Sequence, residues 1–235
     1  LEFISIKQGN QLTISPNTFQ KCESISAIKF ISDSSITFTG ERFHLPKLKS
    51  IICAGDNVNI GNGCFASSKY LQSIKILDRK QFIKIMPNTF NGFDFLTFID
   101  LISDSLMVID SNSFRNCIHL NKISLASGTK IQMLNNCLSG SKKIQSIMIQ
   151  SKEVLLDNYC FYNCCNLQSI LFENVENAQI GQYAFNGCNS LKKFNINVSS
   201  DLTIHDYGFA GAFNLNTVKL DCYTLNLGNF IFNQS

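Results

Sequence analysis

The chain has 235 residues, with 20 lysine and arginine residues against 17 aspartate and glutamate residues, and a formal net charge of +3. This charge is small, and the basic residues are not interleaved with aromatic ones, so we expect no binding to nucleic acid. Charged residues make up only 16% of the sequence. No run of apolar residues is long enough to cross a bilayer, so we expect no direct insertion of this segment into a membrane.

A large apolar residue recurs along the whole chain at spacings of 22 to 25 residues and defines a repeat. We call these residues the anchors. All are phenylalanine except one leucine, and in chain order they are Phe19, Phe43, Phe65, Phe90, Phe114, Leu138, Phe161, Phe185, Phe209 and Phe232. This pattern predicts a single solenoid domain over residues 1–235, built of about ten repeats of about 24 residues.

Each anchor is flanked by two predicted strands. Apolar residues lie seven and five positions before it, as Val154 and Leu156 do in one repeat, and this alternation is typical of a short strand. In the same repeat Leu167, Ile170 and Phe172 lie six, nine and eleven positions after the anchor. Their spacing is the L-x-x-L-x-L pattern of a leucine-rich repeat, and it predicts the second strand.

The segment around the anchor predicts a turn. Ser15-Pro16-Asn17 and similar segments before other anchors resemble helix N-caps, so we expect one short capped helical turn per repeat. Glycine or asparagine often follows two residues after the anchor, where it would tolerate a positive φ and bend the chain. The expected fold is therefore a β-rich, curved solenoid whose neighbouring coils share one hydrophobic interior. An extra residue within 78–81 should bulge from the stack.

One repeat is nearly complete in residues 180–191, IGQYAFNGCNSL. Its pattern I-G-x-x-x-F-x-x-C-x-x-L resembles the BspA-like leucine-rich repeats, and the resemblance covers essentially the whole chain. Members of that family are typically surface or secreted proteins of mucosal anaerobic bacteria and parasitic protists, and several are implicated in attachment to host cells or matrix proteins. The resemblance therefore implies a horseshoe-like fold and a non-enzymatic adhesion module at the cell surface or in secreted form, with a host-cell or extracellular-matrix protein as its partner.

The ten cysteines follow the repeat. Four of them lie three residues after an anchor and three lie one residue before an anchor, so we expect compact buried hydrophobic side chains. Disulfides between neighbouring coils, Cys164 with Cys188 or Cys137 with Cys160, stay open as an alternative. A zinc site is disfavoured because Cys164-Cys165 is not a C-x-x-C motif.

No catalytic motif is present in the sequence. The three histidines, His44, His119 and His205, have different offsets from their anchors and are not expected to converge on one site. We therefore predict no enzymatic activity and no cofactor.

The outer side of the second strand is the predicted binding face. Side chains eight, ten and twelve positions after the anchor should point outward there, along the inner side of the curve. The candidate residues are Lys75, Phe98, Asp100, Ile102, Lys122, Met148, Leu171, Lys193, Asn195 and Lys219. The apolar ones, ringed by lysines, resemble a protein-binding patch. The alternative is that exposed apolar side chains are ordinary and that a sheet uses β-prone residues on both faces.

Neither end of the sequence shows a polar capping repeat, so we expect a fragment of a longer protein whose open ends permit self-association. Two glycosylation sequons begin at Asn197 and Asn233 and are consistent with a secreted route. Two alternatives to adhesion remain: an intracellular, cytoplasmic leucine-rich-repeat scaffold and a structural spacer.

Overall fold

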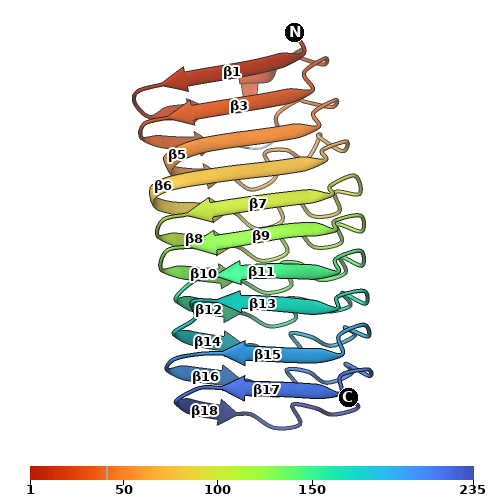
Figure 1. Ribbon diagram of the computed structural model, residues 1–235. Coiled ribbons are helices and arrows are strands. Elements are labelled where there is room, and N and C mark those ends of the chain that lie inside the picture. Colours follow the sequence, from red (N-terminus) through yellow and green to blue (C-terminus); the bar gives the residue numbers. More distant parts are fainter. Residues whose placement is uncertain (41) are drawn as a thin grey trace.

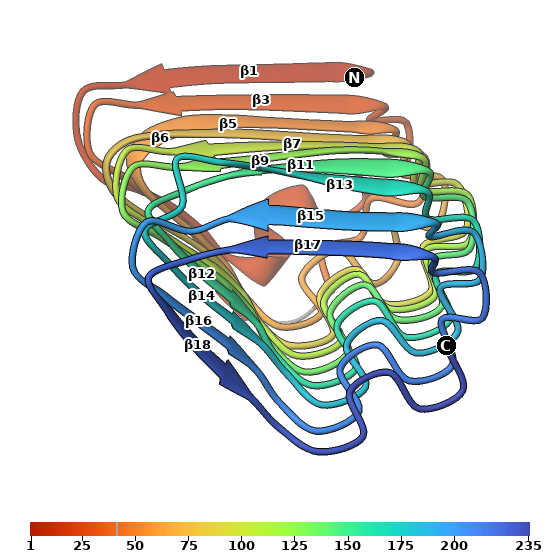
Figure 2. The same ribbon diagram turned by 60° about the horizontal axis from the view of Figure 1, so that its bottom comes forward.

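The protein is described by a computed structural model that covers residues 1–40 and 42–235, apart from the side chains of residues 79 and 81. Its coils stack on one another into a rod (Figure 1). Seen partly along the rod, each coil has three sides (Figure 2). We call them the first face and the second face, which are built of strands, and the turn face, which contains the anchor segments. The predicted solenoid is confirmed.

The strands of each face run in the same direction, because every coil repeats the same path. The first face contains β1 (Phe3–Gln8), β3 (Ala27–Ser32), β7 (Phe98–Ser103), β9 (Lys122–Ser127), β11 (Ser146–Gln150), β13 (Ser169–Glu173), β15 (Lys193–Asn197) and β17 (Thr217–Asp221). The second face contains β2 (Leu12–Ile14), β4 (Ser35–Phe38), β8 (Leu106–Ile109), β10 (Lys130–Met133), β12 (Glu153–Leu156), β14 (Asn177–Ile180), β16 (Asp201–Ile204) and β18 (Thr224–Leu227). Two longer strands, β5 (Ser50–Ile60) and β6 (Ser73–Ile85), continue from the first face into the second.

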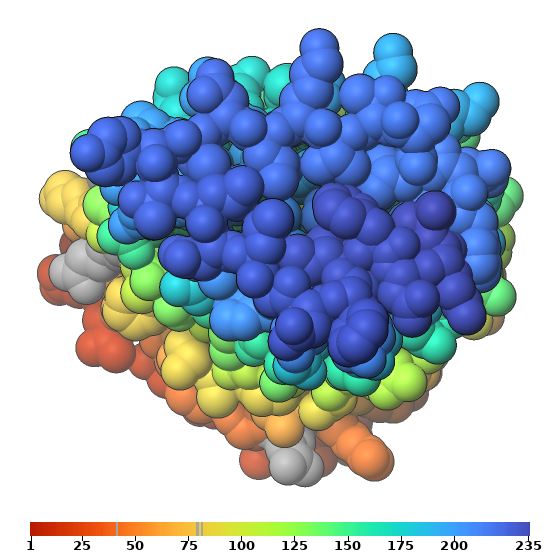
Figure 3. All heavy atoms as spheres, turned by 90° about the horizontal axis from the view of Figure 1, so that it is seen from below, coloured from red at the N-terminus to blue at the C-terminus, as the bar shows by residue number. Residues whose placement is uncertain are grey.

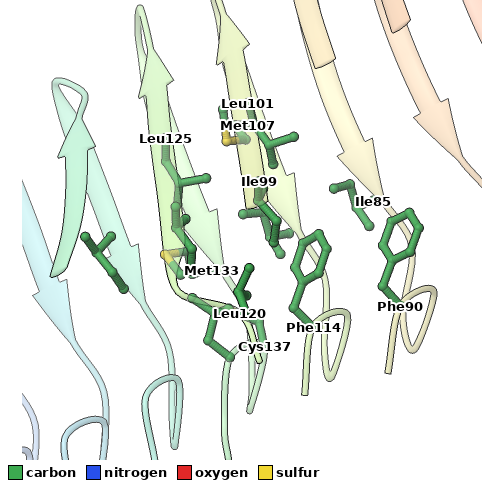
Figure 4. Packing of buried hydrophobic residues seen from close by; sticks show 14 of the residues in the cluster. Ile85, Phe90, Ile99, Leu101, Met107, Phe114, Leu120, Leu125, Met133 and Cys137 are labelled. Atoms are coloured by element: carbon green, nitrogen blue, oxygen red, sulfur yellow. The ribbon is translucent and has the colours of Figure 1, made fainter. Parts of the chain in front are cut away.

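The register of neighbouring coils follows the offset from the anchor, as the repeat predicts. Ile147 pairs with Ile170 on the first face, and Val154 pairs with Ala178 on the second. Inward side chains of equal offset therefore stack in rows and form one continuous core. Figure 4 shows part of this core, in which Phe90 lies beside Phe114; the centroids of the two rings are 5.2 Å apart and their planes differ by 7°.

The anchor segments differ from the predicted helical turn. Within the described residues, helical structure is found in one coil alone, as the 3-10 helix η1 (Pro16–Phe19). In other anchor segments, successive backbone N–H groups donate alternately to a carbonyl of the same turn and to a carbonyl of the next coil. The N–H of Tyr162 donates within its turn to the carbonyl of Tyr159, whereas the N–H of Phe161 donates to the carbonyl of Ala184 in the next coil. A regular helical turn does not form in such a segment, because half of its N–H groups donate to the neighbouring coil and not within the turn.

This alternation needs left-handed backbone on both sides of the anchor. Two residues after it, the expected positive φ is confirmed, for example at Asn163 with φ 57° and Gly187 with φ 76°. Two residues before it, Tyr159 and Tyr183 also have positive φ, at 57° and 53°. Left-handed conformation is uncommon for such bulky residues, and nothing in the sequence pattern predicted it there.

Two irregularities interrupt the stack. The register of β5 and β6 shifts between Gly55 and Asn57, opposite Asp78 and Phe82, which confirms the bulge expected within residues 78–81. The second irregularity is a break in the first face. Strands β15 and β17 form a 2-stranded sheet of their own, whereas the other described strands belong to a 16-stranded sheet. Figure 2 shows these two strands set apart from β13.

The last coil forms the end of the rod that faces the viewer in Figure 3. Several of its large apolar side chains are exposed, namely Leu225, Leu227, Phe230 and Phe232. Within the part of the chain that the structure describes, no helix has the length and apolar character needed to cross a membrane.

Candidate functional site

The predicted binding residues lie on the first face, which contains the strands that follow the anchors. They pair across neighbouring strands in the expected register. Lys75 on β6 pairs with Asp100 on β7, and Met148 on β11 pairs with Leu171 on β13. Because paired residues of parallel strands point to the same side of the sheet, the candidate side chains lie in straight rows across the coils. The sequence alone was sufficient to place them beside one another.

Three of the charged candidates already have partners within the face. The Nζ atom of Lys75 lies 3.3 Å from Oδ2 of Asp100, which makes an ion pair between neighbouring strands. The Nζ atom of Lys122 lies 5.5 Å from the centroid of the Phe98 ring, a cation–π contact that covers part of this aromatic side chain. Phe98 is accordingly half-buried. These contacts hold the side chains in place, and such pairs on a surface stabilise the fold only slightly.

The apolar candidates form two raised parts of the first face and not one continuous patch. Leu171 is 53% exposed and lies beside the half-buried Met148, while Ile102 is 38% exposed on β7. Between them runs β9, whose outward residues beside Ile102 and Met148 are the small Ala126 and Ser124, while the longer Lys122 lies at the start of the strand. Two strand spacings of about 4.8 Å separate β7 from β11, so a shallow strip lies between the two raised parts.

The remaining candidates, Lys193, Asn195 and Lys219, lie beyond the break in the first face. They belong to β15 and β17, where Asn195 pairs with Lys219. Since β15 is not in the same sheet as β13, Lys193 does not continue the sheet on which Leu171 lies. The predicted ring of lysines is therefore divided between two sheets.

The cysteines are free thiols in the structure, and seven of the ten are buried. The Sγ atoms of Cys137 and Cys160 are 3.6 Å apart, at hydrogen-bonding distance. The Sγ atom of Cys164 donates to the carbonyl oxygen of Leu138 at 3.3 Å. Burial raises the pKa of the Cys164 thiol well above its ordinary value. These thiols therefore serve as core side chains that also donate hydrogen bonds to the neighbouring coil.

A stack of aromatic rings at the surface of the turn face was not predicted. It consists of Tyr159, Tyr183, Tyr207 and Phe230, whose successive ring centroids are 5.2, 4.8 and 5.3 Å apart. All four residues lie two positions before an anchor. This common offset was visible in the sequence, but the expected helical turn gave no reason to place the rings in contact.

A family model described as "BspA type Leucine rich repeat region (6 copies)" matches residues 1–102, 83–216 and 155–235. No curated protein matches the chain. A solved structure of a leucine-rich repeat protein from Bacteroides ovatus ATCC 8483 is 14% identical, with a TM-score of 0.38 over 95% of this chain and 80% of that one. A leucine-rich cell surface protein from Faecalibacterium prausnitzii A2-165 is 13% identical, with a TM-score of 0.31 over 89% of this chain and 83% of that one.

Proposed function

Because the chain belongs to the BspA-type leucine-rich repeat family, we propose that it is a non-enzymatic protein-binding module of a cell-surface or secreted protein. Its partner in this proposal is a host-cell or extracellular-matrix protein, bound by the first face. Leucine-rich repeats generally mediate protein interactions, and this solenoid presents a long face of side chains in regular rows.

One observation supports the first face above the others. Leu171 on β13 and Ile102 on β7 are exposed aliphatic side chains on the same sheet, and the small residues Ser124 and Ala126 of β9 lie between them. A protein partner could bury both side chains at once without ordering a loop, so little conformational entropy would be lost on binding. The ion pair of Lys75 with Asp100 at the edge of this region would supply polar contacts and orientation.

The test compares Ile102→Lys with Ile118→Lys. Both isoleucines are 38% exposed, but Ile118 lies four residues after its anchor, outside the first face. The wild-type chain, the two single variants and Leu171→Lys would be titrated onto a panel of purified extracellular-matrix proteins and onto fixed epithelial cells. We expect Ile102→Lys and Leu171→Lys to weaken binding at least about tenfold, which corresponds to 1.4 kcal/mol, and Ile118→Lys to leave it unchanged.

Circular dichroism and the thermal midpoint would confirm that all variants are folded. Equal loss in Ile118→Lys and Ile102→Lys would move the binding site away from the first face. Absence of binding by the folded wild-type chain to every matrix protein and cell type would contradict the adhesion proposal and favour the spacer.

A further inference from the structure

An open hollow of about 500 Å³ lies on the turn face, where one coil has unusually small side chains. The position directly after the anchor is Ser139 in this coil, but it is Arg115 in the coil before and Tyr162 in the coil after. Backbone hydrogen bonds from Asn116 to Ser139, at 2.8 Å, and from Gly140 to Tyr162, at 2.7 Å, fix the three coils in this register. The hollow is therefore a slot one coil wide between longer side chains.

The floor of the hollow requires a glycine. Gly140 has φ +74°, and a Cβ atom built on it would lie 2.2 Å from Oδ1 of Asn116. The side-chain amide of Asn116 thus occupies the space over Gly140. Asn136 and Asn163 also line the hollow. Three side-chain amides, each able to donate and to accept hydrogen bonds, are gathered in this small volume.

Tyr159 forms an aromatic wall of the hollow and is 37% exposed. One face of its ring stacks on Tyr183, with centroids 5.2 Å apart, and Tyr162 packs against it at an interplanar angle of 75°. The equivalent residue of the preceding coil is Asn136, whose side chain is much shorter than a tyrosine ring. The aromatic stack therefore begins at Tyr159, with no tyrosine on the hollow side of its ring.

The charge of the hollow is positive. Arg115 and Lys142 line it and are both exposed, and none of the described lining residues is a carboxylate. Neither cation makes an ion pair with another residue in the described ranges. A small anion that enters the hollow would therefore meet two cations that are not already neutralised.

We propose that this hollow binds a single acidic sugar residue of a glycan, with a carboxylate or a sulfate as its anionic group. The anionic group pairs with Arg115 and Lys142, and the apolar C–H face of the pyranose ring lies against Tyr159. The sugar hydroxyls exchange hydrogen bonds with the asparagine amides. Two coil steps of about 4.8 Å each separate the rows of Arg115 and Tyr162, which is space for one ring. This site lies on the turn face and is independent of the protein-binding proposal for the first face.

The experiment is an NMR titration of the whole chain with methyl β-glucuronide, methyl β-glucoside and methyl glucoside 6-sulfate. The first two differ only in the carboxylate, and the third separates a sulfate from a carboxylate as the preferred anion. We expect the glucuronide or the sulfate to bind with a Kd of about 1 mM, and the neutral glucoside to bind at least about tenfold more weakly. Raising the salt concentration should weaken binding of the anionic sugars alone.

Three variants locate the site. Ser139→Tyr should fill the slot and abolish binding while removing none of the charged, aromatic or amide side chains that contact the sugar. The fold should accept this tyrosine, because Tyr162 lies at the same offset in the next coil. Tyr159→Ala should weaken binding at least about tenfold. The matched control is Tyr207→Ala, at the same offset and in the same stack but outside the hollow, and it should bind normally.

The proposal would be overturned if neither anionic sugar bound more tightly than the neutral glucoside, or if the folded Ser139→Tyr variant bound normally. No binding of either anionic sugar at about 10 mM would also overturn it. A fourth titration uses phosphotyrosine, an anion with an aromatic ring and no sugar. Tighter binding of phosphotyrosine than of both anionic sugars would assign the hollow to a phosphopeptide and refute the saccharide.

Discussion

The thiol of Cys188 donates a hydrogen bond of 3.2 Å to the carbonyl oxygen of Phe161, the anchor of the preceding coil. Cys117 makes the same contact with the carbonyl of Phe90, at 3.3 Å. In the coil of Leu138 the residue at this offset is Ser141, whose hydroxyl replaces the thiol and donates to the carbonyl of the preceding anchor at 3.0 Å. At Cys117, Ser141 and Cys188 a small side chain three residues after the anchor therefore joins its coil to the preceding one by a hydrogen bond.

This equivalence predicts different stabilities for two substitutions of Cys188. Cys188→Ser keeps the donor, whereas Cys188→Ala removes it and also leaves a small void. We expect the alanine variant to lose about 1–2 kcal/mol of unfolding free energy and the serine variant to lose less. Urea unfolding followed by circular dichroism would measure both. An alanine variant as stable as the wild type would show that the thiol contact contributes nothing.

The buried thiols also predict a loss of stability at alkaline pH. Burial raises the pKa of Cys117 from 9.0 to about 12 and that of Cys64 from 9.0 to about 11. Above pH 9 the unfolded chain loses these protons while the folded chain keeps them, so the stabilising contribution is complete below pH 9 and falls as the pH rises towards the folded pKa values.

Urea midpoints between pH 8 and pH 10.5 would test this expectation. Cys117→Ser is the control, because a serine hydroxyl does not ionise in this range, and its stability should fall less steeply over the same interval. Identical pH dependence in the variant and the wild type would mean that Cys117 does not titrate on unfolding.

The strands and their register could be predicted because they depend on a simple period. Inward residues recur at fixed offsets, and a neighbouring coil of the same length brings equal offsets together, as Met148 and Leu171 show. For this reason the candidate residues from β6 to β13 were placed in the right register, whereas the break before β15, which separates Lys193, was not predicted. The separation of the apolar candidates into two raised parts was not predicted, because it depends on the small size of Ser124 and Ala126, which lie between them.

The turn face could not be predicted from local patterns. Segments such as Ser15-Pro16-Asn17 resemble helix N-caps, and the first of them does precede a 3-10 helix. In later coils the N–H groups donate to the next coil instead, as that of Phe161 does, and this choice depends on contacts far apart in sequence. The hollow beside Tyr159 was missed for the same reason, because it results from small residues in one coil between larger ones in two others.

The anchors predict a large cost for removing one ring. Phe161 is fully buried, and its ring lies 5.3 Å from that of Phe185. Phe161→Ala should reduce the unfolding free energy by about 3–5 kcal/mol, because it opens a cavity in the shared core. Phe161→Leu should cost less than half as much, since the preceding coil accommodates Leu138 at this offset. Unfolding in urea would rank the two variants, and an unchanged midpoint for Phe161→Ala would refute the assignment of Phe161 as an anchor.

Gly181 and Gly92 are required for different reasons, so alanine and asparagine should be tolerated in opposite order at the two positions. A Cβ atom on Gly181 would lie 2.6 Å from the backbone N of Asn158 and 2.6 Å from the backbone C of Asp157, in the preceding coil. Gly181→Ala should therefore push the two coils apart and cost about 1–3 kcal/mol, and Gly181→Asn should cost more. Gly92 has φ +69° and no atom within 4 Å of the added Cβ, so only its backbone conformation matters.

At Gly92 the order should reverse. Gly92→Ala should cost about 1–2 kcal/mol because alanine is disfavoured in left-handed backbone, whereas Gly92→Asn should be closer to the wild type. Asn116 already adopts φ 57° at the same offset in the next coil. Thermal midpoints of the four variants would give both orders. If asparagine were better tolerated than alanine at Gly181 as well, the close approach of the two coils would not be the reason for that glycine.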